Sequence, residues 1–335
     1  MKSTLRLLAI LLGFIAWSPY ASAEIQLSNA LAEDIGQAYG FYLGQDYSLS
    51  EISKKYPSMS GLAIIAEKEF SATFNSSIDG MDALMSKHAK TEWEKIKDQL
   101  ANQIANSINI GQITESQARQ FIELVRQRAK GDIESPIIET LLLFKSGYEK
   151  HPEREFLDSY KYKYRTNGTG KAKGVAFSIE TPKTWAAKEG NRPNIVQKFV
   201  SENGRGFELL LVLIKEAPLA PNETITEKDV AEILNPTHIK DFLPGSAEYV
   251  ASGKMTLENL PGFWVHFKMN MSRVRSSIGM EAIMYTIFYK NKMIQIQGQV
   301  TTSANGESMD RGGVKKYEKL FDLMANSFVI ANMYK

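Results

Sequence analysis

Residues able to do chemistry are sparse in this 335-residue chain, which contains four histidines and no cysteine. Without thiols there can be no disulfide, thiolate nucleophile, thiolate zinc site or iron–sulfur cluster. The histidines are His88, His151, His238 and His266. None is followed by a second histidine at the two- to four-residue spacing of local metal motifs. We therefore expect no local metal site and no cofactor.

The glycine-rich segment 167–171 (NGTGK) can be compared with phosphate-binding loops. Such a loop needs a leading glycine, and a serine or threonine after its lysine. Arg165 and Ala172 occupy those two positions. Because Asn-Gly supplies the positive φ angles of tight hairpins, we predict a two-residue-scale turn at Asn167-Gly168 and no phosphate site.

Local signatures of hydrolytic catalysis are also missing from the sequence. There is no G-x-S-x-G elbow to expose a serine nucleophile. The carboxylate pairs Glu67 with Glu69 and Glu92 with Glu94 are two residues apart, so they do not share a helix face. An enzyme would have to use acids and histidines dispersed along the chain.

The most unusual local feature is the alternation of aromatic and basic residues that begins at Tyr160. Residues 161 to 174 include no acid and carry five positive charges, on Lys161, Lys163, Arg165, Lys171 and Lys173. A period of two places Tyr160, Tyr162 and Tyr164 on one strand face and the cations on the other. One interpretation is a basic hairpin that binds an anionic surface. The other, which we favour, is an edge hairpin whose lysines discourage aggregation.

A second candidate binding surface lies on the predicted strands 263–271 and 293–301. If Phe263 and Val265 face the core, then Trp264 and His266 face the opposite way. Three glutamines that alternate with apolar residues on the later strand would join them: Gln295, Gln297 and Gln299. This would make a polar binding face with Trp264 as an aromatic anchor. The plainer interpretation, which we favour, is the less covered side of a sheet.

The elements that must position these residues differ between the two halves of the chain. From Ser28 to about Tyr148 the apolar residues recur three and four apart, which predicts a helical domain over residues 24–150. The expected breaks between about five helices are Pro57, Gly80, Gly111 and residues 131–136. Ser48, followed by Glu51, and Thr114, followed by Gln117, are predicted helix caps.

After Glu149 the apolar period becomes two. Strands are predicted at 177–179, 195–200, 207–214, 263–271, 281–289 and 293–301, with helices at 226–234 and 309–326. The run 207–214 is apolar on both faces, which predicts a strand covered on both sides. Asn291 and Lys292 are the expected turn between the last two strands. Successive strands with few helices predict an α+β domain over residues 151–335, with an antiparallel sheet flanked by helices.

Short motifs in this second half resemble a known family. They are FSIETPKTW at 177–185, Leu260-Pro261-Gly262 before the long strands, and ANSF at 325–328. Together with the predicted order of elements, they resemble the PsbP-like (Mog/PsbP) fold over roughly residues 160 to 331. The resemblance implies an antiparallel sheet flanked by helices, in a family whose members mostly bind or assist other proteins and generally lack catalytic machinery. It transfers no functional residue, and the helical half resembles no family.

The N-terminus has the features of a secretory signal peptide. Lys2 and Arg6 precede an apolar run over residues 7–17, and Ala21-Ser22-Ala23 follows as a cleavage site. The run has 11 residues, whereas a membrane-spanning helix needs roughly 20. We therefore expect cleavage after about Ala23 and a periplasmic or secreted protein that does not span the membrane. Loss of Lys2 and Arg6 leaves as many basic residues as the 38 acidic ones.

With 43% hydrophobic and 23% charged residues, the composition excludes a disordered or polytopic membrane protein. We predict an exported, non-catalytic interaction or assembly module of the bacterial cell envelope. Its expected partner is another envelope protein, or else an anionic envelope polymer or lipid head groups; export disfavours nucleic acid. The alternatives are an envelope enzyme, a hydrolase or isomerase with dispersed catalytic residues, and a small-ligand or lipid carrier with an apolar cavity under the sheet.

Overall fold

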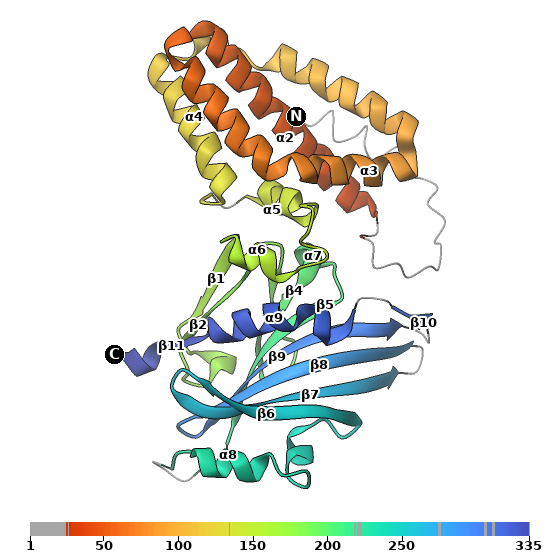
Figure 1. Ribbon diagram of the computed structural model, residues 1–335, viewed down its shortest axis with the longest axis vertical. Helices are drawn as coiled ribbons and strands as arrows, with labels where there is room; N and C mark the ends of the chain where they lie inside the picture. The colour runs from red at the N-terminus through yellow and green to blue at the C-terminus, as the bar shows by residue number, and fades with distance from the viewer. Residues whose placement is uncertain are drawn as a thin grey trace. The chain divides into compact units, whose positions relative to one another are not determined.

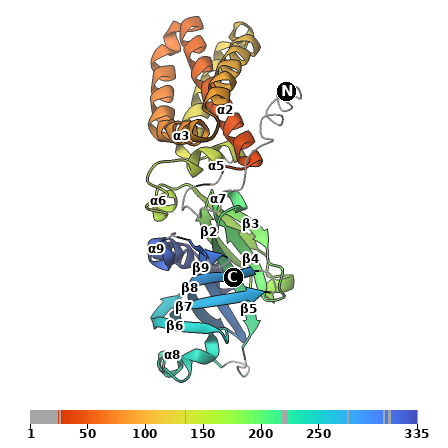
Figure 2. The same cartoon turned by 90° about the vertical axis from the view of Figure 1, so that its right-hand side faces the viewer.

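The computed structural model describes residues 25, 27–133, 135–217, 219, 223–273, 276–304, 307–309 and 312–334. The predicted signal peptide, residues 1–23, lies outside the described residues. The chain divides into two compact units, and the boundary between them falls between Glu149 and Lys150. The described part of the first unit is helical and the second combines sheets with helices (Figures 1 and 2). This confirms the predicted fold class.

The described elements of the first unit are α2 (Asn29–Lys55), η1 (Pro57–Met59), α3 (Ser60–Ser107), η2 (Ile110–Gln112), α4 (Glu115–Lys130) and α5 (Pro136–Leu143). The predicted cap at Thr114 is confirmed, because its hydroxyl accepts from the Gln117 amide at 3.3 Å and the Gln117 side chain accepts from the Thr114 amide at 2.8 Å. Each side chain thus satisfies a backbone donor at the helix start. The predicted cap at Ser48 is wrong. Ser48 lies inside α2 and donates to the Gly44 carbonyl at 2.7 Å.

The long helix α3 passes through Gly80 without a break, which corrects the sequence prediction. A Cβ at Gly80 would lie 3.0 Å from the carbonyl oxygen of Phe144, so the missing side chain lets the end of α5 approach α3 closely. The break occurs instead at Ala89, whose φ of −154° and ψ of 51° are not helical. Figure 1 shows that α3 changes direction along its length.

Contacts across the kink hold the two segments of α3 together. The Trp93 indole N–H and the Lys97 ammonium both donate to Asp82 Oδ1, each at 2.8 Å. Trp93 is 1% exposed, and its ring lies edge-on to Tyr39 of α2, with 5.2 Å between the ring centroids. We call Asp82, Trp93 and Lys97 the kink clasp, because they fix the direction in which the second segment runs.

The described part of the second unit contains two antiparallel sheets. The first has the strand order β1 (Lys161–Thr166), β2 (Phe177–Pro182) and β11 (Val329–Ile330). The second has the order β3 (Ala186–Glu189), β4 (Ile195–Val200), β5 (Glu208–Glu216), β9 (Lys292–Ala304), β8 (Ser276–Tyr289), β7 (Leu260–Arg273) and β6 (Ala247–Leu257), with β10 (Glu307–Ser308) paired to β9. The helices are α6 (Glu153–Leu157), η3 (Gly170–Ala172), α7 (Ser201–Gly204), α8 (Glu227–Ile233), η4 (Ile239–Phe242), α9 (Gly313–Asn326) and η5 (Ala331–Tyr334).

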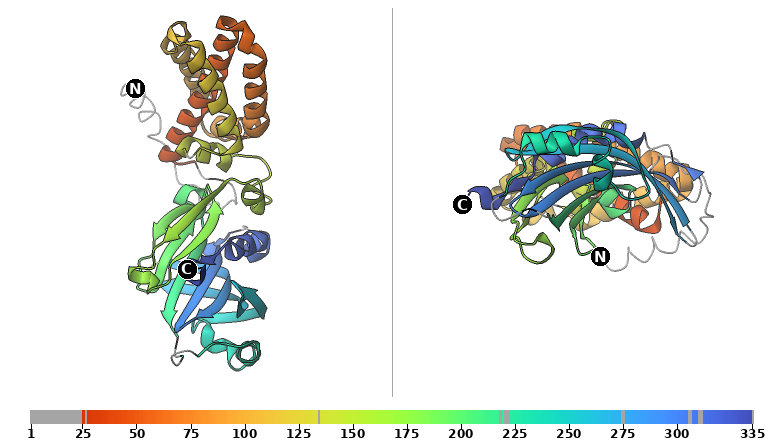
Figure 3. Two further views of the ribbon diagram at one scale, coloured as in Figure 1. Left: turned by 90° about the vertical axis from the view of Figure 1, so that its left-hand side faces the viewer. Right: turned by 90° about the horizontal axis from the view of Figure 1, so that it is seen from below.

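Each face of the larger sheet has its own core. On one face α9 and the smaller sheet bury Phe199, Ile296 and Phe321 within a large apolar cluster. On the other face α8 and η4 cover the β7 and β8 side chains, including Phe263 and Phe267. In Figure 3, α8 is the teal helix beside the sheet. A sheet with two covered faces reads as apolar on both sides of its strands.

Strand β5 corresponds to the apolar run predicted to be covered on both sides. Leu210, Val212 and Ile214 are completely buried toward α9, whereas the alternate residues Leu209 and Leu211 are only half-buried. The tight turn expected at Asn291 and Lys292 is displaced by one residue, because β8 ends at Tyr289 and β9 begins at Lys292.

The C-terminal segment completes the smaller sheet. Val329 and Ile330 pair with Ser178 and Phe177 of β2. On either side of this pairing, the Asn332 side chain accepts from the Ala176 amide at 2.7 Å and the Ser327 hydroxyl accepts from the Glu180 amide at 2.8 Å. Residues 327–332 are thus bound to β2, which precedes them by about 150 residues in the sequence.

Candidate functional site

The predicted basic segment forms β1 and the loop that follows it. β1 is an edge strand of the smaller sheet. Lys161 and Lys163 lie 2.7 and 4.0 Å from the carboxylate of Glu180 on β2. Lys171 lies 2.6 Å from Glu189 on β3. Carboxylates from neighbouring strands therefore neutralise much of the positive charge that the sequence concentrates here.

The tyrosines of this segment face inward to different degrees. The Tyr164 ring packs against Phe177 and Phe199, at centroid distances of 6.0 and 5.6 Å, and burial raises the pKa of its hydroxyl. Tyr162 is 39% exposed, and Arg165 is exposed as well. Binding of an anionic surface by this segment stays a prediction, with Tyr162, Lys163 and Arg165 as its exposed residues.

The connection from β1 to β2 is longer than the tight turn that the sequence predicts. Residues 167–176 link the two strands and include η3. The Asn167 side chain accepts from the Thr169 amide at 3.0 Å, so the asparagine forms a local Asx turn instead of the hairpin turn. Lys173, near the end of the loop, donates to the Asn194 side chain at 2.8 Å.

The second predicted surface does not form a single face. Across β8, Trp264 of β7 aligns with Ile296 of β9, and Val265 aligns with Gln297. Directly opposed residues in an antiparallel sheet point to the same side. Trp264 and His266 therefore face α9, whereas the glutamines lie on the opposite face with Val265. The alternation was predicted correctly, but the two sets of residues do not share a face.

His266 contributes to the attachment of α9. Its Nε2 lies 2.9 Å from Glu281 Oε1, and Glu281 Oε2 accepts from the Val314 amide at 2.8 Å, at the start of α9. Lys268 is 3.9 Å from the same carboxylate. A histidine beside a largely buried carboxylate is what the enzyme alternative requires. Here both carboxylate oxygens are occupied, so the pair serves as a helix cap.

The other histidines lie elsewhere and do not converge. His151 Nδ1 is 3.8 Å from Glu153, and His238 Nδ1 is 3.2 Å from the Glu232 carbonyl oxygen. Within the described ranges, no group of three or more histidine, aspartate and glutamate side chains is placed to hold a metal ion.

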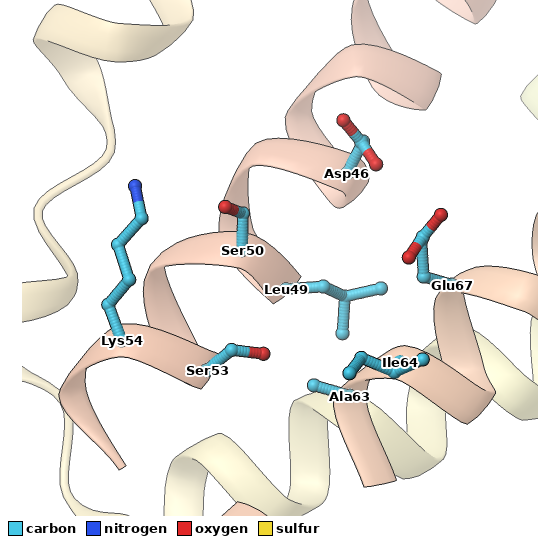
Figure 4. A pocket seen from close by; sticks show the side chains of 8 residues that line it. All are labelled: Asp46, Leu49, Ser50, Ser53, Lys54, Ala63, Ile64 and Glu67. Carbon is cyan, nitrogen blue, oxygen red and sulfur yellow. The ribbon is translucent and has the colours of Figure 1, made fainter. Parts of the chain in front are cut away.

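A groove with a volume of about 440 Å³ lies between α2 and α3. Leu49 of α2 and Ala63 of α3, at 3% and 1% exposed, form its floor. Figure 4 shows Leu49 and Ile64 pointing into the space between the two helices, with the carboxylates of Asp46 and Glu67 on one side of it. The remaining lining residues are Ser50, Ser53 and Lys54.

Large aliphatic side chains are exposed beside this groove. Leu62, Ile64 and Ile65 are 38%, 49% and 48% exposed, and all three lie within the first two turns of α3. A single exposed aliphatic residue needs no explanation, whereas three within four positions of one helix make the start of α3 a candidate interaction surface, with Ile64 in the groove lining. We call these three residues and the groove the α2–α3 surface.

The α2–α3 surface is acidic on one side. Burial and the charge of Glu67 raise the pKa of Asp46, and Lys68 opposes this shift. Glu67 has a weak ion pair with Lys68 at 3.5 Å. On the other side, Lys54 is paired with Glu51 at 2.7 Å. The carboxylates of Asp46 and Glu67 therefore repel one another, and a bound cation would stabilise both.

Sequence reasoning missed this surface, although one signal was present. Residues 62–65 read Leu-Ala-Ile-Ile, and successive residues of a helix point about 100° apart. Four consecutive apolar residues cannot all face one core, so some had to be exposed. The position of the acids beside them depends on how α2 pairs with α3, which the sequence does not state.

No protein-family model matches this chain, and no curated protein matches its sequence. Solved structures do resemble it over about half its length. They include a cyanobacterial PsbP from Synechocystis sp. PCC 6803, with 17% identity and a TM-score of 0.30, covering 51% of this chain and 92% of that one. LpqN of Mycobacterium tuberculosis, a protein involved in cell envelope biogenesis, has 10% identity and a TM-score of 0.32, covering 52% and 92%.

A third similar structure, from Bacteroides thetaiotaomicron, has 11% identity and a TM-score of 0.29, and the match covers 52% of this chain and 49% of that one. The PsbP-like family that the sequence resembles is thus represented among the matching structures. At these TM-scores the similarities assign no function to this chain. None of the helices in the described ranges combines the length and the apolar character needed to cross a bilayer.

Proposed function

We propose that this protein is a non-catalytic binding module of the bacterial cell envelope, and that its α2–α3 surface binds a segment of a partner protein. The expected segment carries a lysine or arginine next to an aliphatic side chain. The observation that supports this most directly is the exposure of Ile64 beside the carboxylates of Asp46 and Glu67 in one groove. The envelope location is part of this proposal and is supported by the signal-peptide features of residues 1–23.

The chemistry of the groove favours this occupant. An aliphatic side chain of the partner would cover Leu49 and Ile64, and burial of apolar area contributes roughly 25 cal/mol per Å². A cation beside it would pair with Asp46 and Glu67 and remove their mutual repulsion. An anionic lipid surface would instead meet these two carboxylates and be repelled, so a protein segment fits better than a membrane.

A photo-crosslinking amino acid at position 64 tests the proposal. We expect a discrete crosslinked product in intact cells, with a crosslinked peptide that contains a lysine or arginine near an aliphatic residue. The same substitution at Lys95 is the matched control, because that side chain is 61% exposed and lies beyond the kink. Equal crosslinking at both positions, or none at position 64, would contradict the proposal.

Charge reversal separates the acidic part of the surface from its apolar part. Glu67→Lys removes the repulsion and places a cation where the partner's cation would bind, so we expect at least about a tenfold loss of crosslinking at position 64. Glu92→Lys makes the same change of net charge at a distant exposed position and should have no effect. Normal crosslinking in the Glu67→Lys variant would show that the acidic side of the groove does not contribute to partner binding.

A further inference from the structure

The second unit contains a separate hollow at one end of its larger sheet, with a volume of about 810 Å³. Its apolar wall comes from four places in the chain: Ile225 before α8, Leu260 and Pro261 at the start of β7, Phe288 and Tyr289 at the end of β8, and Met333 of η5. Both cores of the unit contribute, because Phe288 packs on the α8 side and Met333 on the α9 side. This volume and apolar character are typical of small-molecule sites.

The polar groups at the rim favour a negatively charged ligand group. Lys290 is exposed, and its ammonium lies 5.1 Å from the centre of the Tyr289 ring. No carboxylate among the described residues pairs with it. The acid of this lining, Glu223, is already engaged in another interaction. An anionic group entering the hollow would therefore find an available cation and no free acid.

A second unpaired cation lies on the same face of the sheet as Phe288. Lys215 of β5 is opposite Met293 of β9, which is opposite Phe288 of β8. The three side chains point to one side of the sheet, so Lys215 is two strand spacings, about 10 Å, from Phe288. Lys215 is half-buried, and burial and the neighbouring Lys173 lower its pKa. No carboxylate within the described ranges is paired with it.

We propose that this hollow binds a single-chain amphiphile with an anionic head, in the manner of a fatty carboxylate. The chain lies against Leu260, Phe288 and Met333, and the carboxylate is bound by Lys290, with Lys215 adding a second positive charge on the face of the sheet that carries Phe288. This site is in a different unit from the α2–α3 surface and does not depend on it. The proposal gives the carrier alternative a specific location and a specific ligand chemistry.

Calorimetric titration with three twelve-carbon probes tests the head group. Dodecanoate, below its micelle-forming concentration, should bind at least about tenfold more tightly than dodecanol or dodecyltrimethylammonium. Lys290→Gln should abolish this preference and Lys215→Gln should reduce it. Lys254→Gln is the matched control, because Lys254 is an exposed lysine of β6 in the same unit. Absence of dodecanoate binding, or an unchanged preference in Lys290→Gln, would overturn the proposal.

Methionine-methyl NMR tests the location independently of affinity. The Met333 resonance, assigned by its loss in Met333→Ala, should shift on addition of dodecanoate. The resonance of Met59, which is completely buried in the helical unit, should not move. Met333→Trp fills the hollow and should prevent binding while leaving the circular dichroism spectrum unchanged. Saturable binding that leaves the Met333 resonance in place would show that the site is elsewhere.

Discussion

His266 and Glu281 lie diagonally across neighbouring strands, with 2.9 Å between Nε2 and Oε1, and the second oxygen of Glu281 caps α9 through the Val314 amide. The side chains are 21% and 14% exposed. One carboxylate therefore joins two strands to the helix that covers them. The stability of α9 on the sheet should depend on this residue more than on any charge on the surface of the unit.

Replacement of Glu281 tests this dependence. Glu281→Ala leaves the Val314 amide without its cap and His266 without its partner, which should cost about 1–2 kcal/mol. Amide hydrogen exchange in the first turn of α9 should become roughly 5- to 30-fold faster. Glu248→Ala, at an exposed position of β6, is the control. Unchanged exchange in α9 would show that Glu281 does not hold the helix.

Gly298 of β9 provides a test of the packing between α9 and the sheet. A Cβ at this position would lie 2.4 Å from the ring of Phe321, which is completely buried. Gly298→Ala should therefore destabilise the second unit by about 1–3 kcal/mol, the usual range for an overpacked core. Gly245→Ala, where nothing lies within 4 Å, should be close to neutral. Urea unfolding followed by circular dichroism compares the two, and equal midpoints would contradict the prediction.

The kink clasp should make the helical unit sensitive to acid. Burial by itself would raise the pKa of Asp82, but hydrogen bonds from Lys97 and Trp93 lower it below its ordinary value. A carboxyl group with a lower pKa in the folded state stabilises the fold above its unfolded pKa, and this contribution is lost as pH falls through the folded value. Thermal unfolding temperatures should thus fall as the pH is lowered below about 4.

The Asp82→Asn variant separates the clasp from general acid effects. Asparagine can still accept from Trp93 but no longer pairs with the Lys97 charge. The variant should be less stable than the parent at pH 7, and the difference should shrink as the pH approaches 3. Asp98→Asn, in the same helix, should keep the parent's pH dependence. A constant difference between Asp82→Asn and the parent across this range would rule out the clasp as the titrating element.

The charge of Glu67 is predicted to act on the pKa of Asp46 across the groove. Burial and then Glu67 raise the pKa of Asp46, so Glu67→Gln should lower that pKa part of the way toward its ordinary value. Burial remains, and the shift should not vanish. Carboxyl-carbon NMR measures it directly, with Glu115→Gln on α4 as the control. If the pKa of Asp46 does not change in Glu67→Gln, the two acids do not interact across the groove.

Local signals in the sequence predicted the local structure well. The capping box at Thr114 and Gln117 depends on residues three apart, so it could be read directly. The cap at Ser48 was wrong because the apolar period continues beyond it to the completely buried Ile52. The helix break predicted at Gly80 was also wrong. This glycine allows close packing against the Phe144 backbone, and the helix continues through it.

The candidate sites required information that the sequence does not contain. The period of two correctly placed Trp264 and Val265 on opposite faces of the sheet. Because both faces are covered, however, the polarity of the side chains did not indicate whether Trp264 and the glutamines share a face. The positive charges on β1 could be read from the sequence. Their partner Glu180 could not, because the sequence does not state which residue of β2 lies beside them. The groove beside Ile64 depends on the pairing of two helices, and no local pattern specifies that pairing.

The pairing of Val329 and Ile330 with β2 has a consequence for the synthesis of this protein. The helical unit is complete well before Val329 and Ile330 are synthesised, and domains generally fold as they emerge. The smaller sheet, in contrast, lacks its third strand until these two residues have left the ribosome. The second unit should therefore close later than the helical unit, and a chain truncated before Ser327 would leave β2 without this partner.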